Sequence, residues 1–208
     1  MMEHMVSSHH DLRFSVVNQY NLYVPGNPYT ASELSAMAYH GVLRPQFGPY
    51  YVDVDLPDTP SQRAKSVRMV ADQLIDGSWT ATLLTAAWIY LGGQAPEMFE
   101  AATATPHRGA TRATVMPTAF RHTDYLQRSE IDEEDLRVVG GVVVTSPELT
   151  IEDLLRIGGS KRHQQQAHQL CALVDVATLH QRFDSEVPGM AKARELLEKL
   201  THSASSAA

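Results

Sequence analysis

The segment Leu56-Pro57-Asp58-Thr59-Pro60-Ser61 constrains the fold of this chain more than any other stretch of its sequence. Proline fixes its own φ angle and disfavours helix in the residue before it, so a polar run with two prolines interrupts regular structure. We therefore expect a small module over residues 1–57 and a larger domain over residues 58–200. The tail from Thr201 to residue 208 is rich in Ser and Ala and is expected to be disordered.

The small module is predicted to contain a helix followed directly by a β-hairpin. Thr30 can cap the helix, and Glu33 three residues later completes a capping box. The β-rich runs 42–43 and 50–52 flank the tight loop Phe47-Gly48-Pro49, which is typical of a hairpin. A helix followed by such a hairpin is the outline of a winged helix.

The larger domain is predicted to hold helices around a short sheet, which gives the whole chain an α+β fold. Apolar residues at helical spacing predict a helix from about Ser61 to Ile75, and a second one before Gly92-Gly93. Residues 98–104, 111–116 and 136–144 are predicted strands because they are rich in β-branched and aromatic residues or in apolar runs. The last third is predicted to be helical, with one long helix that carries Leu170, Leu173, Val174 and Ala177 and another opened by Pro188.

Charge and cysteine content limit the classes of function that this chain can serve. The net charge is −7, and residues 1–57 carry two basic against five acidic side chains, which disfavours general attraction to nucleic acid. Cys171 is the only cysteine, and no run of 18 apolar residues is present, so we expect a reduced, cytoplasmic protein with no membrane span. Residues 107–128 form the only locally basic region, and its cations are Arg108, Arg112, Arg121 and Arg128.

Motifs for catalysis are missing from the sequence. It has no Gly-x-Gly-x-x-Gly, no P-loop and no Gly-x-Ser-x-Gly, so nucleotide binding and serine hydrolysis lack a basis. Thr150 and Asp153 have the spacing of a capping box, with Leu149 and Leu154 as a hydrophobic staple, and we interpret them as structural. The acidic run 130–135 lacks the glycine and ligand spacing of a calcium loop, which favours a solvated loop. We therefore expect no enzyme activity, no cofactor and no metal.

Five loose motifs in a fixed order give the chain its one family resemblance. They are Ser32-Glu33-Leu34 through Val52, Arg63-Ala64, Thr85-Ala86-Ala87-Trp88-Ile89-Tyr90-Leu91-Gly92, Val144-Thr145-Ser146-Pro147 with Thr150 and Asp153-Leu154, and Ala193-Arg194-Glu195-Leu196-Leu197. In this order the segments resemble the AbiEi antitoxins of type IV toxin–antitoxin systems, in the shorter form seen in actinobacteria. The resemblance covers roughly residues 30–200.

The resemblance implies an N-terminal winged helix that binds operator DNA and a larger domain that neutralises a nucleotidyltransferase-like toxin. Neutralisation can proceed by stable binding or indirectly, and both routes stay open here. The alternative function is a winged-helix transcriptional repressor with no toxin partner. Since Arg44 is the only cation of the predicted wing, the module is expected to bind DNA poorly, and a dimer or toxin interface is its other role.

The candidate contact residues follow from these expectations. Arg44 and Gln46 are the candidates for DNA contact in the wing. Arg108, Arg112, Arg121 and Arg128 are candidates for contact with nucleic acid or an acidic face of the toxin, because arginine recognises phosphate and carboxylate through paired donors. Lys161 and Arg162, after Gly158-Gly159, are further candidates, with a solvated loop as the other interpretation.

Overall fold

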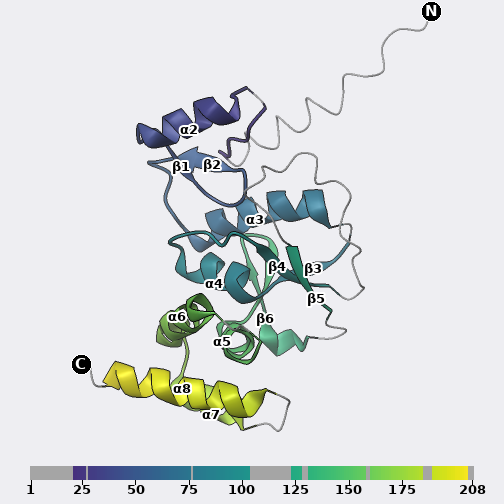
Figure 1. Ribbon diagram of the computed structural model, residues 1–208. Helices are drawn as coiled ribbons and strands as arrows, with labels where there is room; N and C mark the ends of the chain where they lie inside the picture. The colour runs from purple at the N-terminus through teal and green to yellow at the C-terminus, as the bar shows by residue number, and fades with distance from the viewer. Residues whose placement is uncertain are drawn as a thin grey trace, which may run out of the picture.

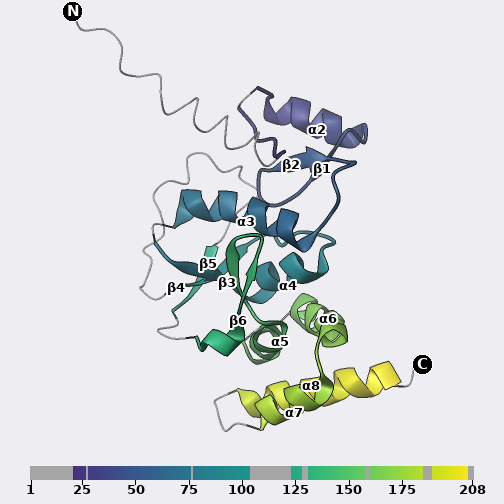
Figure 2. The same ribbon diagram turned by 180° about the vertical axis from the view of Figure 1, so that it is seen from behind.

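The computed structural model has an α+β fold, as predicted, with helices around a two-stranded and a five-stranded sheet. It describes residues 21–26, 28–75, 77–103, 123–127, 131–157, 160–184 and 189–205. The described elements follow one another from α2 at one end of the molecule to α7 and α8 at the other, with the larger sheet between them (Figures 1 and 2). Neighbours in the sequence are therefore mostly neighbours in space.

The N-terminal module consists of α2 (Ala31–Tyr39) and a hairpin of β1 (Leu43–Pro45) and β2 (Tyr51–Asp53). The predicted capping box is confirmed: the Thr30 hydroxyl accepts a hydrogen bond from the Glu33 backbone N–H, and the Glu33 carboxylate accepts from the Thr30 backbone N–H. Within α2 only Leu34 is fully buried. The helix therefore adds little to the core and stands at the edge of the molecule.

The hairpin packs into the core of the larger domain, so packing crosses the predicted boundary at residue 57. Phe47, Tyr50 and Val52 belong to the same buried cluster as the helix and sheet residues that follow. The Phe47 ring stacks on the ring of Trp88, with 5.2 Å between centroids. Offset stacking of aromatic rings adds to the free energy gained from burying them. The loop of the hairpin thus anchors the N-terminal module to the rest of the protein.

Two helices pack against each other and against the larger sheet. Helix α3 (Pro60–Leu74) begins where the sequence predicts, with the Thr59 side chain capping it and Pro60 in its first turn. Helix α4 (Leu83–Leu91) ends at Gly92, also as predicted, and has a positive φ of 76° there. The helix is buried on most of its surface, and its buried residues include Thr85, Ala86 and Ile89.

The larger sheet has the strand order β5-β4-β3-β7-β6. Strands β3 and β7 pair in parallel, as do β4 and β5, whereas β3 with β4 and β6 with β7 are antiparallel. The bounds are β3 Trp79–Ala81, β4 Phe99–Thr103, β5 Thr123–Gln127, β6 Leu136–Val139 and β7 Val142–Thr145.

The strand predictions are confirmed in part. The strand expected at 98–104 is β4. The single strand expected at 136–144 is wrong, because Gly140 and Gly141, both with positive φ, turn the chain into the β6–β7 hairpin. The strand expected at 111–116 lies outside the described residues. Sequence reasoning missed β3 and β5.

Helix α5 (Pro147–Arg156) begins earlier than its predicted capping box. Ser146 is the cap, its hydroxyl accepts from the Leu149 backbone N–H, and Pro147 supplies the first helical residue. Thr150 is therefore inside the helix, and its hydroxyl donates to the Ser146 carbonyl at 2.7 Å. The prediction that Thr150 and Asp153 form a capping box is wrong. All seven residues from 149 to 155 are buried.

The C-terminal part is helical as predicted, but the expected long helix is two helices joined by a turn. Helix α6 (Lys161–Leu170) leads into the short 3-10 helix η2 (Cys171–Leu173), and α7 (Val176–Phe183) starts afresh with Asp175 as its cap. Helix α8 (Met190–Ser205) continues beyond Thr201, where we expected disorder, as far as residue 205. Residues 206–208 lie outside the description.

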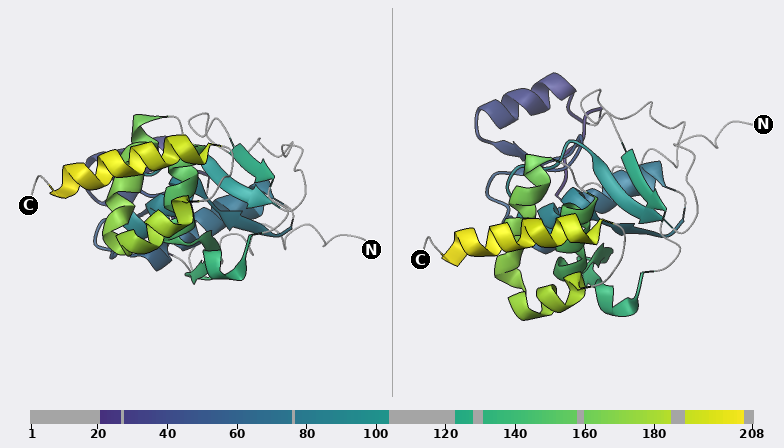
Figure 3. Two further views of the ribbon diagram at one scale, coloured as in Figure 1. Left: turned by 90° about the horizontal axis from the view of Figure 1, so that it is seen from below. Right: turned by 60° about the horizontal axis from the view of Figure 1, so that its bottom comes forward.

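The last two helices cover one end of the molecule. Seen from below, α7 and α8 lie in front of α5 and α6 (Figure 3, left). Met190, Ala193 and Leu197 of α8 are buried against this helical layer, as the spacing of its apolar residues predicts. None of the helices that the structure describes is both long and apolar enough to cross a membrane.

Candidate functional site

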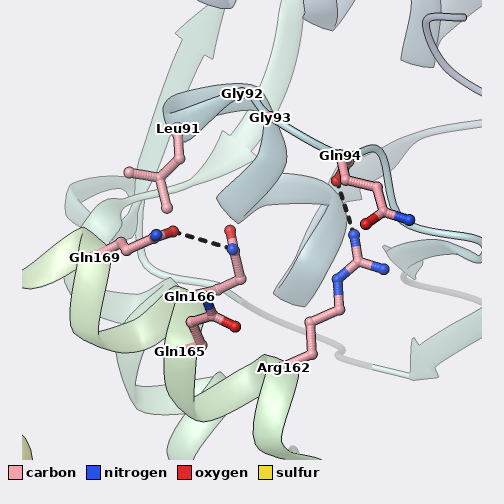
Figure 4. A pocket seen from close by; sticks show the side chains of 8 residues that line it. All are labelled: Leu91, Gly92, Gly93, Gln94, Arg162, Gln165, Gln166 and Gln169. Atoms are coloured by element: carbon pink, nitrogen blue, oxygen red, sulfur yellow. Dashed lines mark hydrogen bonds between the residues drawn. The ribbon is translucent and has the colours of Figure 1, made fainter.

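A groove between helix α6 and the turn that follows α4 is the candidate functional site (Figure 4). It has a volume of about 650 Å³. Pockets that hold ligands commonly have volumes of about 300–1,000 Å³. The residues that line it are Leu91, Gly92, Gly93, Gln94, Arg162, Gln165, Gln166 and Gln169.

The wall on the side of α4 is held in place by its own hydrogen bonds. The Gly92 backbone N–H donates to the Trp88 carbonyl, and the Trp88 indole N–H donates to the Gly93 carbonyl at 3.1 Å. The buried guanidinium of Arg63 donates to the carbonyls of Ile89 and Tyr90 at 3.0 and 3.1 Å. These last carbonyls of α4 would otherwise lack partners, as at any helix end. The turn is thus a fixed edge of the groove.

The wall on the side of α6 is a stripe of polar side chains. Arg162, Gln165, Gln166 and Gln169 are three or four residues apart, so they project from one face of the helix. The opposite face buries Ala167 and Leu170 in the helical core. Burial of this apolar face therefore turns the glutamine face toward the groove.

The lining is suited to hydrogen bonding. One Nη atom of Arg162 donates to the main-chain carbonyl of Gln94 at 2.8 Å, and this bond spans the groove. The Gln166 amide donates to Gln169 at 3.1 Å. A carboxamide offers both donors and an acceptor, whereas arginine offers donors only and does not lose its charge in proteins. Of the eight lining residues only Arg162 is ionisable, so this groove can bind a polar partner but has no group that transfers a proton.

Positive charge is concentrated at the start of α6. Lys161 and Arg162 follow the cap Ser160, and the first turn holds no acidic residue. The N-terminal end of a helix already carries partial positive charge, so cations there are unfavourable for the isolated helix. The His163 ring turns inward, with its Nε2 atom 3.9 Å from a carboxylate oxygen of the buried Glu100. Lys161 and Arg162 are left at the surface end of the groove.

The two predicted DNA contacts of the wing are engaged within the protein. The Arg44 guanidinium donates to the Leu56 carbonyl at 3.1 Å and to the Gln46 side chain, and lies 3.8 Å from the Asp58 carboxylate. Gln46 is 3% exposed. Gln46 would have to leave its buried position to contact DNA, and Arg44 is already held by bonds within the protein.

The predicted contact residues of the larger domain are only partly described. Arg108, Arg112, Arg121 and Arg128 lie outside the described residues. Of the remaining two, Arg162 lines the groove and Lys161 is exposed beside it.

Sequence reasoning missed the four glutamines and the role of the glycine turn. The spacing of residues 162, 165, 166 and 169 was the available signal, but a polar helix face is equally typical of plain solvent exposure. Gly92-Gly93 was interpreted only as a helix end. The groove forms where α6 packs against that turn, and this contact joins parts of the chain that are far apart in the sequence.

A cluster of charged side chains joins α7 to the centre of the protein, and sequence reasoning missed it too. Arg182 donates two hydrogen bonds to Asp135, at 2.7 and 2.6 Å, and one to Glu152 at 2.6 Å. Burial disfavours the charged guanidinium, but the bonds to the two carboxylates outweigh it and raise the pKa of Arg182.

The acidic run 130–135 is predicted to be a solvated loop, and this prediction is wrong for the last three residues of the run. Residues Glu133–Asp135 form the 3-10 helix η1, and Asp135 is buried. The fixed charge of Arg182 on the neighbouring helix is what makes this burial tolerable.

No protein-family model matches the chain, and no curated protein matches it at a significant level. Among the residues that the structure describes, no three His, Cys, Asp or Glu side chains gather as a metal site would require.

Proposed function

We propose that this chain is an antitoxin that binds and neutralises a nucleotidyltransferase-like toxin, as its resemblance to the AbiEi family implies. One observation carries the proposal. Three of the five segments that bear the resemblance lie far apart in the sequence, yet in the structure they are joined by hydrogen bonds.

The unit begins at α3 and ends at α5. Arg63 donates to the carbonyls of Ile89 and Tyr90 at the end of α4. The Tyr90 hydroxyl donates to the Thr145 carbonyl at 2.8 Å, and the same carbonyl accepts from the Thr150 hydroxyl at 3.2 Å. Because these three motifs contact one another, they form one structural unit, which is compatible with a resemblance of fold. This supports the resemblance as one of fold, from which the antitoxin function is inferred.

The groove supplies a binding surface for the proposed toxin. Its lining combines carboxamides with one guanidinium, and such groups bind partners through hydrogen bonds and charge. The toxin would meet the end of the groove at Lys161 and Arg162. The bonds that hold Arg44 and the burial of Gln46 favour toxin binding over DNA binding as the main activity.

A repressor without a toxin is the second candidate function, and the helix–hairpin order of α2, β1 and β2 favours it. Operator binding of this kind depends on cations that neutralise phosphate groups. In the described module, Arg44 is the one basic side chain apart from histidine, and it is occupied.

The test is a growth assay in which the neighbouring gene is expressed alone and together with the full chain. We expect the neighbouring product to stop growth alone and the full chain to restore it. A reporter fused to the operon promoter is measured in the same cells. Failure to restore growth, with the chain present in soluble form, would overturn the antitoxin proposal. Reporter repression in that case would favour the repressor.

A further inference from the structure

We infer that the groove beside α6 receives an extended segment of the toxin that carries an acidic side chain. This inference rests on the proposed antitoxin function and names the kind of contact that the function uses. It depends on three properties of the groove: its unused carboxamides, its anchored arginine and its charge.

The carboxamides match a peptide main chain. The side chains of Gln94 and Gln165 make no hydrogen bond to another residue in the described part of the protein, although both line the groove. Each can donate to a carbonyl and accept from an N–H. An extended peptide presents these two groups on both of its edges, and therefore suits a groove with a free carboxamide on each wall.

Arg162 is set up to bind a carboxylate. One hydrogen of an Nη atom of Arg162 is donated to the Gln94 carbonyl, while Nε and the other Nη have no partner within the described residues. The second hydrogen of the bonded Nη lies beside a free donor, and two neighbouring donors of a guanidinium match the two oxygens of a carboxylate. Because the side chain is already anchored, binding costs less side-chain entropy than it would for a mobile arginine.

The electrostatics favour a peptide over nucleic acid. Lys161 and the N-terminal end of α6 add to the positive potential around Arg162, which favours a carboxylate there. A long polyanion would also meet the rest of a chain whose net charge is −7. None of the eight lining residues is aromatic, so the groove offers no ring on which a base could stack.

The test measures binding of the full chain to the purified product of the neighbouring gene and to overlapping peptides that span it. Arg162→Glu should weaken toxin binding by about tenfold or more, since a lost charged hydrogen bond at an interface costs at least about 1.4 kcal/mol. The affinity of Arg162→Lys for the toxin should lie between those of the unaltered chain and Arg162→Glu. The double variant Gln94→Ala with Gln165→Ala should weaken binding by about three- to tenfold.

Matched controls carry the same chemical changes away from the groove. Lys192→Glu on α8 makes the same charge reversal, and Gln181→Ala on α7 removes an exposed carboxamide. Both should bind the toxin as the unaltered chain does. Urea denaturation checks that every variant is folded.

The outcomes separate this inference from the proposed function. Peptides that bind should contain Asp or Glu and lose binding when that residue becomes Asn or Gln. If the unaltered chain neutralises the toxin but Arg162→Glu binds it as well as Lys192→Glu does, the inference is overturned and the antitoxin function stands. If Arg162→Glu instead abolishes binding to a single-stranded RNA oligonucleotide and leaves toxin binding intact, the inference is overturned in favour of RNA. Failure of the unaltered chain to neutralise the toxin removes both.

Discussion

Replacement of Arg63 by methionine should destabilise the whole protein, because this buried side chain closes the end of α4. Arg63 is 4% exposed, and its guanidinium donates to the carbonyls of Ile89, Tyr90 and Asp58 at 3.0 to 3.1 Å. It also lies 3.0 Å from a carboxylate oxygen of Asp58. Methionine fills much of the same space but donates no hydrogen bond.

The magnitude follows from the groups left without partners. Removing one partner of a buried ion pair costs about 3–5 kcal/mol, and each hydrogen bond from a charged donor contributes about 1.5–3 kcal/mol. The Asp58 side chain is 43% exposed, so water can solvate it again and the lower part of the range applies. We expect a loss of about 3–4 kcal/mol, which is large beside a total stability of about 5–15 kcal/mol.

Urea denaturation followed by circular dichroism measures this loss. With a slope of about 2–3 kcal/mol per molar urea, the midpoint should fall by about 1–2 M. The control is Arg68→Met on the same helix, where the side chain is half-exposed and forms an ion pair with Asp72 at 3.7 Å, and its cost should stay below about 0.5 kcal/mol. A loss below about 1 kcal/mol for Arg63→Met would refute the argument that this guanidinium satisfies the end of α4.

Three further predictions concern stability. Gly92→Ala should cost about 1–3 kcal/mol, because φ is 76° and the new Cβ would lie 2.8 Å from a guanidinium nitrogen of Arg63. In a double-mutant cycle its cost should shrink when Arg63→Met is already present, and simple additivity would contradict that contact. Arg182→Met leaves the buried Asp135 without its cation and leaves Glu152 with the longer ion pair to Arg156 at 3.5 Å. Amide hydrogen exchange should therefore be faster in α7 of the variant than in the unaltered chain, with little change in α3, and an equal increase in both helices would argue against a local role. Burial raises the pKa of Tyr90 from 10.0 to about 12, so the stabilising neutral phenol is fully present below pH 10 and is lost as pH rises through about 12. The free energy of unfolding should therefore fall over this range by about 1–2 kcal/mol, a value discounted for partial exposure, and a chain with Tyr90→Phe should show a smaller fall because the pKa of Tyr23 is raised as well.

Local signals in the sequence predicted helix ends better than strand pairing. The capping box at Thr30 and the stop at Gly92 depend on a few adjacent residues, and both are confirmed. Strand β3 is only three residues long, and what makes it a strand is its position between β4 and β7. Such pairing depends on residues far away in the chain, and no local pattern announces it.

The candidate site was predictable only as far as its charged members. Arg162 is a candidate from the sequence because it is a cation that follows Gly158-Gly159, whereas no local pattern distinguishes Gln165 from an ordinary exposed residue. Thr150 was misjudged because its spacing to Asp153 resembles a cap, although Ser146-Pro147 just before it is a stronger start for a helix. Two start signals competed within five residues, and the proline decided between them.

The parallel pairing of β3 with β7 also sets the order in which the chain can fold. The Thr145 hydroxyl reaches the carbonyl of Ala81, 64 positions earlier, and the two strands meet there at the centre of the sheet. During synthesis β3 and β4 leave the ribosome first, and one edge of β3 stays unpaired until β7 follows. Unpaired strand edges promote aggregation, and pairing across long separations is slow. Fragments that end before residue 142 should therefore aggregate. The nascent chain should bind chaperones most strongly after β4 has been synthesised and before β7 has.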